Sequence, residues 1–338
     1  MKTQAVVFAA KEKIEMREVD LPPLGEDQML TKTIYTFVSP GTELRVLSGC
    51  YGSEDHFPFV PGYAVISRVI KVGSAVKNFR VGDAISSCWV GKFENVQSYW
   101  GGQSAYHVYT ANPEFHVLLP ELNDEELLPY VITEVAAISF RGMCLAAPQK
   151  EDHVLVIGQG MIGRFSAEFF RISGASVTVG DIDKNRLRDA ESYGFTAVDL
   201  SDENAAERLS CCSRNKYDIV VECSGTSAGL KLAYSQLRVP PREVPNRYIK
   251  NVPKLVLQAS YIENISIEPA NFFKAEGVML ITPYDREFED RKLVSELIRT
   301  KKIDTSGYVR NIFTVDGFIE AYRKLQSHEI SSAVFKWN

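Results

Sequence analysis

Short apolar runs separated by turn residues characterise roughly the first 120 residues of the chain. Val, Ile, Tyr, Phe and Thr are frequent in these runs, and proline or glycine lies between them, as is typical of strands joined by turns. The runs that predict strands are Thr3–Ala9, Gln28–Phe37, Tyr63–Val72, Asp83–Trp89 and Ser104–Tyr109. The breaks between them include Pro22-Pro23, Ser39-Pro40-Gly41, Pro61-Gly62 and Gly101-Gly102. This spacing predicts a compact antiparallel β domain.

The pattern changes from Leu127 onward. Apolar residues in Leu127–Ala147 recur about every three to four positions, which predicts a helix. Further along, apolar strands alternate with helices, as in parallel βαβ units whose sheet is covered on both faces. The predicted strands are His153–Ile157, Ser176–Val179, Asp218–Glu222, Lys254–Gln258 and Val278–Ile281, and the predicted helices are Met161–Ile172 and Lys184–Tyr193. The proline-rich segment Leu237–Pro253 interrupts this alternation and predicts a long loop.

The last stretch predicts helices at Arg291–Arg299 and Val315–Leu325, and a final strand at Ala333–Trp337 that returns to the first domain. At roughly 150 residues per domain, the length of 338 residues also favours two domains. We therefore expect an α/β protein with a β-rich domain at 1–125, a parallel α/β domain at 126–284 and a C-terminal return at 285–338.

Composition and charge exclude several classes of protein. The chain has 38 Lys and Arg against 43 Asp and Glu, a formal net charge of −5, and lacks a dense basic stripe, so we expect no nucleic-acid partner. No apolar run approaches the roughly 18 residues that span a bilayer, and the N-terminus lacks the layout of a secretory signal, so we expect no membrane association. Scattered cysteines then predict reduced thiols in a cytoplasmic protein, at positions 50, 88, 144, 211, 212 and 223.

A glycine-rich turn follows the predicted strand His153–Ile157 and opens the next helix. In this context the pattern G-x-G-x-x-G is typical of dinucleotide-binding folds. Gly158 permits the tight turn, Gly160 lets the backbone approach a pyrophosphate, and Gly163 lets the helix pack closely on the strand. Amides of the first helical turn then face the phosphates. The sequence thus predicts a Rossmann doubly wound sheet with the cofactor-binding turn Gly158-Gln159-Gly160-Met161-Ile162-Gly163.

Asp181 supplies the second half of this fingerprint, 23 residues after Gly158 and just past a predicted strand. A carboxylate there accepts hydrogen bonds from ribose hydroxyls and repels a 2′-phosphate, so NAD is favoured over NADP. The alternative is an Asp that caps the next helix. Lys184 and Arg186 follow closely, and a cation there would soften the preference for NAD.

The whole chain resembles the medium-chain dehydrogenase/reductase superfamily, which includes the zinc alcohol dehydrogenases. The resemblance rests on the order of domains, on the glycine-rich turn with Asp181, and on Pro61-Gly62, Val72-Gly73, Val81-Gly82-Asp83 and Gly101-Gly102 before Tyr106. It implies a GroES-like catalytic domain at 1–125, a Rossmann NAD-binding domain at 126–284 and an active site in the cleft between domains. It also implies a small-molecule substrate and a homodimer formed through the nucleotide domain.

The zinc ligands of the superfamily are largely missing here. Its Cys-x-Thr-Asp segment aligns with Pro40-Gly41-Thr42-Glu43, or with Ser39 at the ligand position after a shift of one residue. Its Gly-His-Glu becomes Gly62-Tyr63-Ala64, and only Glu134 retains a ligand position. A catalytic zinc normally has three protein ligands. Cys88 also stands alone where a structural zinc lobe would have four cysteines, so we expect no bound metal.

Two stretches, Ser39–Glu43 and Phe59–Tyr63, resemble a zinc-lacking branch of the superfamily that includes bacteriochlorophyllide a dehydrogenase. That dehydrogenase oxidises a secondary hydroxyethyl group on a chlorin ring. Ala64 departs from the Glu expected there, and the loop Leu237–Pro253 is foreign to that branch. The resemblance therefore implies the reaction type and leaves the substrate open.

Without zinc, the alcohol proton needs a positioned base. The aligned positions make Tyr63 the group that hydrogen-bonds the substrate oxygen, Glu134 a base or a group that tunes Tyr63, and Thr42 a proton relay. The alternatives are that Tyr63 fills the vacated ligand space, that Thr42 is a turn hydroxyl, and that Glu134 pairs with a cation such as Arg141. Glu43 is interpreted as a structural carboxylate.

Substrate contacts are predicted on loops that flank the cleft. His107 lies on a strand that often lines the cleft, and His56, Tyr51 and Trp100 lie on neighbouring loops. Aromatic and polar side chains of this kind suit a sugar or a cyclitol.

The leading hypothesis is a zinc-independent, NAD-dependent dehydrogenase that acts on a secondary alcohol of a cyclic metabolite. One alternative is an NADPH-dependent quinone or enoyl reductase, against which Asp181 argues. Another is a non-catalytic nucleotide-sensing protein that kept the fold and lost the site.

Overall fold

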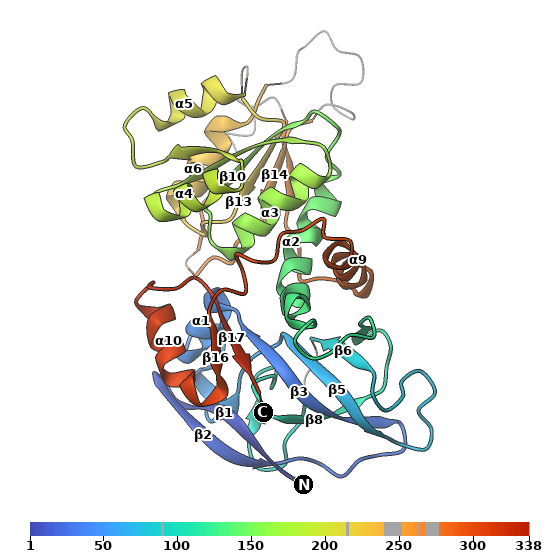
Figure 1. The fold of residues 1–338 in the computed structure, drawn as a ribbon. Helices are drawn as coiled ribbons and strands as arrows, with labels where there is room; N and C mark the ends of the chain where they lie inside the picture. The colour runs from blue at the N-terminus through green and yellow to red at the C-terminus, as the bar shows by residue number, and fades with distance from the viewer. Residues whose placement is uncertain (89–90, 214–215, 240–251, 263, 268–276, 338) are drawn as a thin grey trace. The chain divides into compact units, whose positions relative to one another are not determined.

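The computed structural model describes residues 1–88, 91–213, 216–239, 252–262, 264–267 and 277–337 (Figure 1). Its contacts divide the chain into two compact units. Unit 1 comprises Met1–Val135 and Phe288–Asn338, and unit 2 comprises Ala136–Glu287. The first division lies at Val135 rather than at the expected 125, because the 3₁₀ helix η2 (Leu128–Ile132) packs on strands β3 and β5 of unit 1.

Unit 1 contains two β-sheets. The smaller has the strand order β2-β1-β4-β7, and the larger has the order β16-β17-β3-β5-β6-β9, with β8 also paired to β3. The strands of the smaller sheet are β1 Lys2–Ala10, β2 Lys13–Asp20, β4 Phe59–Val60 and β7 Gln97–Ser98. Those of the larger sheet are β3 Gln28–Val38, β5 Val65–Val72, β6 Ala84–Ser87, β8 Tyr106–Thr110, β9 His116–Leu118, β16 Ile312–Thr314 and β17 Ala333–Lys336. Most strand pairs of unit 1 are antiparallel, as predicted, whereas the β4–β7 and β16–β17 pairs are parallel.

The C-terminal segment completes the larger sheet and the core of unit 1. β17 pairs with β3 in antiparallel register. Helix α10 (Phe318–Gln326) contributes Tyr322, whose ring packs edge-on against Phe8 with a centroid separation of 5.4 Å. The ring of Phe59 also packs against Phe8, with a centroid separation of 5.6 Å. Residues from both ends of the chain therefore share one core.

A helix begins where the sequence analysis expected a break between strands. α1 (Pro40–Leu47) has Ser39 at its N-cap and Pro40 at its first helical position. Proline suits that position, because the N–H it lacks would have no helical partner there and its φ is already fixed. The segment Ser39-Pro40-Gly41 therefore starts a helix of unit 1. The other short helices of unit 1 are η1 Glu54–His56, α9 Phe288–Arg299 and η3 Val315–Gly317.

The predicted helix Leu127–Ala147 consists of η2 followed by α2 (Thr133–Ala146). Within the described residues, Leu128–Ala146 is the single helical segment long and apolar enough to cross a membrane, with a mean hydropathy of 1.3. This corrects the expectation that no apolar run reaches that length. Of its most apolar window, 61% is buried inside the protein, as in a core helix.

Unit 2 is built on a parallel sheet with the strand order β12-β11-β10-β13-β14-β15. Its strands are β10 His153–Ile157, β11 Ser176–Asp181, β12 Thr196–Asp199, β13 Ile219–Glu222, β14 Lys254–Leu257 and β15 Met279–Ile281. Its helices include α3 Met161–Ile172, α4 Lys184–Ser192, α5 Ala205–Cys212 and α6 Ser227–Gln236. The predicted α/β fold class with a Rossmann-like sheet is confirmed (Figure 1).

The order of the strands determines where unit 2 binds a ligand. The chain runs from β10 outward to β11 and β12, and then continues on the other side of β10 with β13. In open α/β sheets, ligands bind at such a switch point, beside the carboxyl ends of the strands. Most of the predicted loop Leu237–Pro253, residues 240–251, lies outside the described residues.

Phe335→Ala tests the contribution of the C-terminal strand to unit 1. Phe335 is fully buried, and truncation of such a residue leaves a cavity, so we expect the free energy of unfolding to fall by about 3–5 kcal/mol. Urea denaturation measures this loss. The matched control is Lys336→Ala, on an exposed position of the same strand, which should change stability by less than about 1 kcal/mol. Equal losses in the two variants would contradict this account of the core.

Candidate active site

The glycine-rich turn of unit 2 has the geometry of a phosphate-binding loop. Gly158 follows β10 with φ +90°, a conformation that L side chains rarely adopt. A Cβ on Gly163 would lie 1.8 Å from the carbonyl oxygen of Gly158, so only glycine lets α3 start this close to the loop. Gly160, the N-cap of α3, has no atom within 4 Å of its Cβ position. The backbone at Gly160 is therefore open to an approaching group.

Asp181 ends β11 and ties the second strand to the glycine-rich turn. Its carboxylate accepts hydrogen bonds from the backbone N–H groups of Gln159, at 2.5 Å, and Asp183, at 2.8 Å. Arg186 lies 3.7 Å from the same carboxylate. The helix cap is Asp183, whose side chain accepts from the first amides of α4. The capping role considered for Asp181 thus belongs to its neighbour.

The turn after β13 forms the other side of this switch point, and the sequence analysis did not identify it. Glu222 is fully buried and accepts hydrogen bonds from the backbone N–H groups of Ser224, at 2.8 Å, and Gly225, at 3.1 Å. The hydroxyl of Tyr261 also donates to Glu222. A Cβ on Gly158 would lie 2.8 Å from the backbone nitrogen of Ser224, so this turn and the glycine-rich turn are in direct contact.

In unit 1, Tyr63 lies between a hydroxyl and an aromatic ring. Its phenol O–H donates to Ser39 Oγ over 2.8 Å. Its ring packs edge-on against Trp100, with the centroids 5.4 Å apart. Tyr63 is 6% exposed. Tyr63, at one aligned ligand position, is therefore hydrogen-bonded to Ser39, which takes another ligand position after a shift of one residue in the alignment.

A buried carboxylate organises the residues behind Tyr63. Glu43 Oε1 accepts from the backbone N–H of Ser39 at 3.0 Å, and Oε2 accepts from the Tyr322 hydroxyl at 2.6 Å and from Gln103 Nε2 at 3.4 Å. Gln103 in turn accepts from Thr36 at 2.6 Å through its Oε1. The side chain of Glu43 is fully buried. Burial raises its pKa to about 7, against the opposing effect of its hydrogen-bond donors.

Glu134 has a different set of partners. Its Oε1 accepts from Ser86 Oγ at 2.8 Å and lies 3.9 Å from a guanidinium nitrogen of Arg291. Arg291 is itself buried and donates to the Phe115 carbonyl at 3.0 Å. Arg141, the cation considered for Glu134, pairs with Glu287 at 2.5 Å. These contacts favour the interpretation of Glu134 as one member of a buried ion pair.

The other predicted residues of unit 1 differ in their surroundings. Thr42 lies in the first turn of α1, partly exposed, one residue before Glu43. Tyr51 and Trp100 both have left-handed backbones, with φ of +68° and +71°. Non-glycine residues in this conformation are costly and are concentrated at functional sites. The hydroxyl of Tyr99, whose ring packs edge-on against Trp100, donates to the Tyr51 carbonyl.

His107 lies inside unit 1 rather than on its surface. Its ring nitrogens are 3.2 Å from Thr33 Oγ1 and 3.1 Å from the Gly101 carbonyl oxygen, and the ring stacks on Tyr109. Burial lowers its pKa to about 4. These contacts favour a structural role for His107 over the predicted substrate contact.

The residues at the aligned ligand positions do not fit a catalytic zinc. The side chains of Ser39 and Tyr63 are hydroxyl groups that hydrogen-bond to each other. The carboxylate of Glu134 faces the positive charge of Arg291. Zinc in proteins prefers thiolate, imidazole and carboxylate ligands. Among the described residues, no group of three or more His, Cys, Asp or Glu side chains is arranged to hold a metal.

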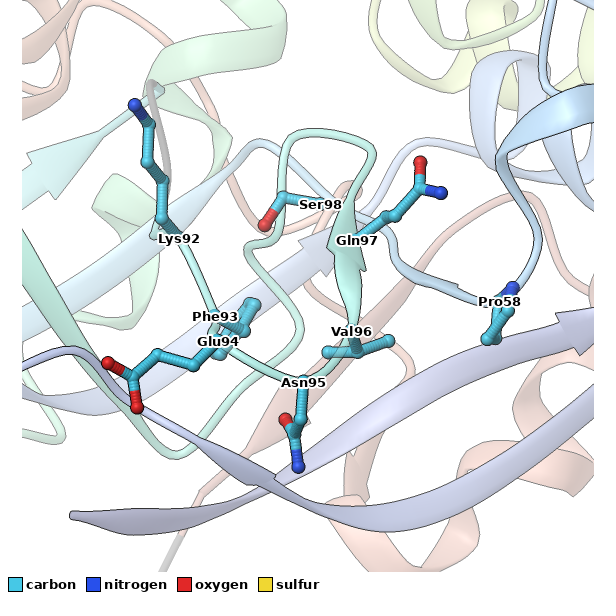
Figure 2. A pocket seen from close by; sticks show the side chains of 8 residues that line it. All are labelled: Pro58, Lys92, Phe93, Glu94, Asn95, Val96, Gln97 and Ser98. Carbon is cyan, nitrogen blue, oxygen red and sulfur yellow. The ribbon is translucent and has the colours of Figure 1, made fainter.

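A surface hollow of about 750 Å³ is lined by Pro58 and by residues 92–98 of the same unit (Figure 2). Figure 2 shows the side chains of Lys92, Glu94 and Gln97 pointing in different directions rather than toward one point. The predicted site residues do not line this hollow, so the candidate site remains the environment of Tyr63.

Unit 2 combines a Rossmann-like parallel sheet with a glycine-rich turn, and the chain is similar to known dehydrogenases. Residues 25–121 match the family of the alcohol dehydrogenase GroES-like domain. The chain is 23% identical to L-threonine 3-dehydrogenase of Escherichia fergusonii, over 97% of this chain and 98% of the relative. The match to the GroES-like domain therefore lies within unit 1, and the similarity to L-threonine 3-dehydrogenase extends along nearly the whole chain.

Solved structures share the fold along the whole chain. Alcohol dehydrogenase TADH from Thermus sp. ATN1 superposes with a TM-score of 0.83 at 19% identity, covering 99% of this chain and 100% of the other. Galactitol-1-phosphate dehydrogenase from Escherichia coli gives 0.81 at 17% identity, covering 98% and 99%. Two further structures of the same fold contain cofactor: a Sinorhizobium meliloti 1021 dehydrogenase with NADP (0.80, 18% identity) and an Escherichia coli CFT073 alcohol dehydrogenase with NADH (0.83, 17% identity), each covering 99% of both chains.

Gly160→Ala and Gly163→Ala separate cofactor binding from packing. At position 163 the added Cβ overlaps the Gly158 carbonyl, so we expect both a lower melting temperature and weaker binding of NADH. At position 160 the Cβ meets no protein atom, so we expect an unchanged melting temperature and NADH binding weakened by about tenfold or more. Fluorescence titration and thermal unfolding measure the two effects. A Gly160→Ala chain that binds NADH normally would contradict the loop assignment.

Glu43→Gln tests the buried carboxyl through the pH dependence of stability. The folded-state pKa of Glu43, about 7, exceeds its ordinary value of 4.5, so the folded protein retains a proton that the unfolded chain loses between these pH values. The stabilising contribution is complete below about pH 4.5 and is lost as pH rises through about 7. Relative to E43Q, the free energy of unfolding of the wild type should fall by about 3 kcal/mol between pH 4.5 and 8. Urea denaturation of both proteins at each pH measures the difference, and a constant difference would be incompatible with a raised pKa.

Proposed function

We propose that this chain is a zinc-independent, NAD-dependent dehydrogenase that oxidises a secondary alcohol of a cyclic metabolite, or reduces the corresponding ketone. The homologues are alcohol, polyol and threonine dehydrogenases, which supports the reaction class. The observation that carries the proposal is the hydrogen bond between Tyr63, at one aligned ligand position, and Ser39, which takes another after a shift of one residue. The two hydroxyl groups form a hydrogen bond with each other in place of bonds to a metal.

The residues of unit 2 fit a dinucleotide. The open backbone at Gly160 and the N-terminal amides of α3 would hold the pyrophosphate, and Asp181 would accept from the ribose. When bound, NAD supplies the hydride acceptor. The Asp181 carboxylate disfavours the additional phosphate of NADP through charge repulsion, whereas Arg186 beside it reduces that repulsion.

Tyr63 is the group we assign to the alcohol oxygen in unit 1. Its phenol can hydrogen-bond the substrate and receive the hydroxyl proton as the hydride leaves. Thr42, partly exposed on the same helix as Ser39 and Glu43, is assigned to proton exchange with solvent. Glu134 is assigned a structural role because of its pairing with Arg291.

A cyclic polyol is the substrate class that the surroundings of Tyr63 favour. Trp100 packs against Tyr63. Tyr51, which follows helix α1 in the sequence, is exposed. Aromatic faces pack against the C–H faces of sugar or cyclitol rings. The same reaction type would also serve the secondary alcohol on a chlorin side chain. The protein is also proposed to be a cytoplasmic homodimer, for which the exposed apolar residues of β15, a terminal strand of its sheet, offer a pairing edge.

Two titrations and a turnover assay test this proposal. We expect NADH to bind at least about tenfold more tightly than NADPH, because the Asp181 carboxylate meets the 2′-phosphate. We expect NAD-dependent turnover of at least one secondary alcohol in a panel of L-threonine, galactitol 1-phosphate, D-sorbitol and myo-inositol, and Tyr63→Phe should lower kcat by about 100-fold or more. A preference for NADPH together with reduction of a quinone or an enone would instead favour the reductase alternative. Tight NADH binding with no turnover of any alcohol or carbonyl would favour a nucleotide sensor.

A further inference from the structure

Ser39 occupies a helix N-cap, but its side chain does not cap the helix. Serine at this position usually accepts a hydrogen bond from an amide of the first turn. In α1, which is fully described, the Ser39 hydroxyl makes no such bond, although the backbone carbonyl of Ser39 accepts from Glu43 N–H at 2.8 Å. Its oxygen accepts the phenol proton of Tyr63 instead, at 2.8 Å. The serine is therefore directed toward Tyr63.

Glu43 holds Ser39 in that direction. The Glu43 carboxylate accepts the backbone N–H of Ser39, one turn earlier in the chain. The carboxylate is held in turn by the hydroxyl of Tyr322, 279 residues away in sequence, and by Gln103. Ser39 is 7% exposed and Glu43 is fully buried, so the Glu43 carboxylate holds the backbone of Ser39 inside unit 1.

The proposed function leaves a gap in the path of the proton. A neutral phenol that receives the alcohol proton must release its own proton at the same time. In this structure the phenol O–H of Tyr63 points at Ser39 Oγ. Ser39 is therefore the acceptor that the geometry supplies.

We propose that Ser39 is a proton-relay residue of the dehydrogenase and that Glu43 is its positioning residue; this inference rests on the proposed function. As the hydride leaves the carbinol carbon for nicotinamide, the alcohol O–H bond breaks and its proton binds the Tyr63 oxygen. The phenol proton moves to Ser39 Oγ, and the serine hydroxyl proton passes to solvent by way of Thr42, the partly exposed residue already assigned to proton exchange. The alcohol becomes a ketone, NAD becomes NADH, and one proton is released. Ketone reduction follows the same path in reverse.

Variants at Ser39 test the relay, with the panel alcohol that the wild type oxidises fastest as the probe. Ser39→Ala should lower kcat by about 10- to 100-fold and leave KM within about twofold, because the relay acts in the chemical step. Ser39→Thr, which keeps a hydroxyl, should restore kcat to within about threefold of wild type. The matched control is Ser48→Ala on the same helix, whose hydroxyl donates to the Arg45 carbonyl, and it should leave kcat unchanged. NADH titration checks that unit 2 is intact in every variant.

A double variant distinguishes a relay from a purely structural serine. If Ser39 acts through Tyr63, adding Ser39→Ala to Tyr63→Phe should lower kcat no further than Tyr63→Phe alone. Glu43→Gln should lower kcat by about 3- to 10-fold without changing KM. A Ser39→Ala enzyme with kcat within twofold of wild type, or multiplicative losses in the double variant, would overturn the relay while leaving the proposed function intact. A wild-type chain that oxidises no alcohol in the panel would overturn the proposed function and the relay with it.

Discussion

The carboxyl group of Glu43 is the buried polar group around which the polar interior of unit 1 is arranged. A carboxyl group removed from water is costly unless hydrogen-bond donors replace the water. The structure supplies those donors from Ser39, Gln103 and Tyr322, which belong to the N-terminal and C-terminal parts of the unit. Ser39 is the N-cap of the helix that carries Glu43. The hydrogen bonds that the Glu43 carboxyl group needs therefore also position Ser39, the partner of Tyr63. Structure and chemistry in unit 1 therefore depend on the same set of contacts.

The two units contribute different parts of the proposed reaction. In unit 2, backbone geometry dominates, since Gly158, Gly160 and Gly163 each meet a separate steric requirement and Asp181 holds the turn. In unit 1, side chains dominate, and the hydroxyl groups of Ser39 and Tyr63 are hydrogen-bonded to each other. The proposal that this chain acts without zinc agrees with the general independence of fold and chemistry.

Local patterns in the sequence predicted much of the fold. Apolar runs and the glycine fingerprint located the strands from β10 to β15 with the exception of β12, and they located α3 with its observed bounds. The segments that were missed, such as β2, β12 and α5, are polar and partly exposed, so tertiary pairing rather than periodicity determines them. α1 was missed because Ser-Pro-Gly favours both a turn and a helix start. Glu43 and Tyr322 are 279 residues apart in sequence, so no local pattern indicates their hydrogen bond. This contact could be found only from the structure.

The central claim is that a hydrogen-bonded pair of hydroxyls, and not a metal, handles the alcohol proton. The most direct test is the metal content of the purified, active enzyme, measured by mass spectrometry alongside turnover before and after treatment with a chelator. The account predicts far less than one zinc per chain and unchanged turnover after chelation. One zinc per chain, with activity lost on its removal and regained on its return, would contradict it.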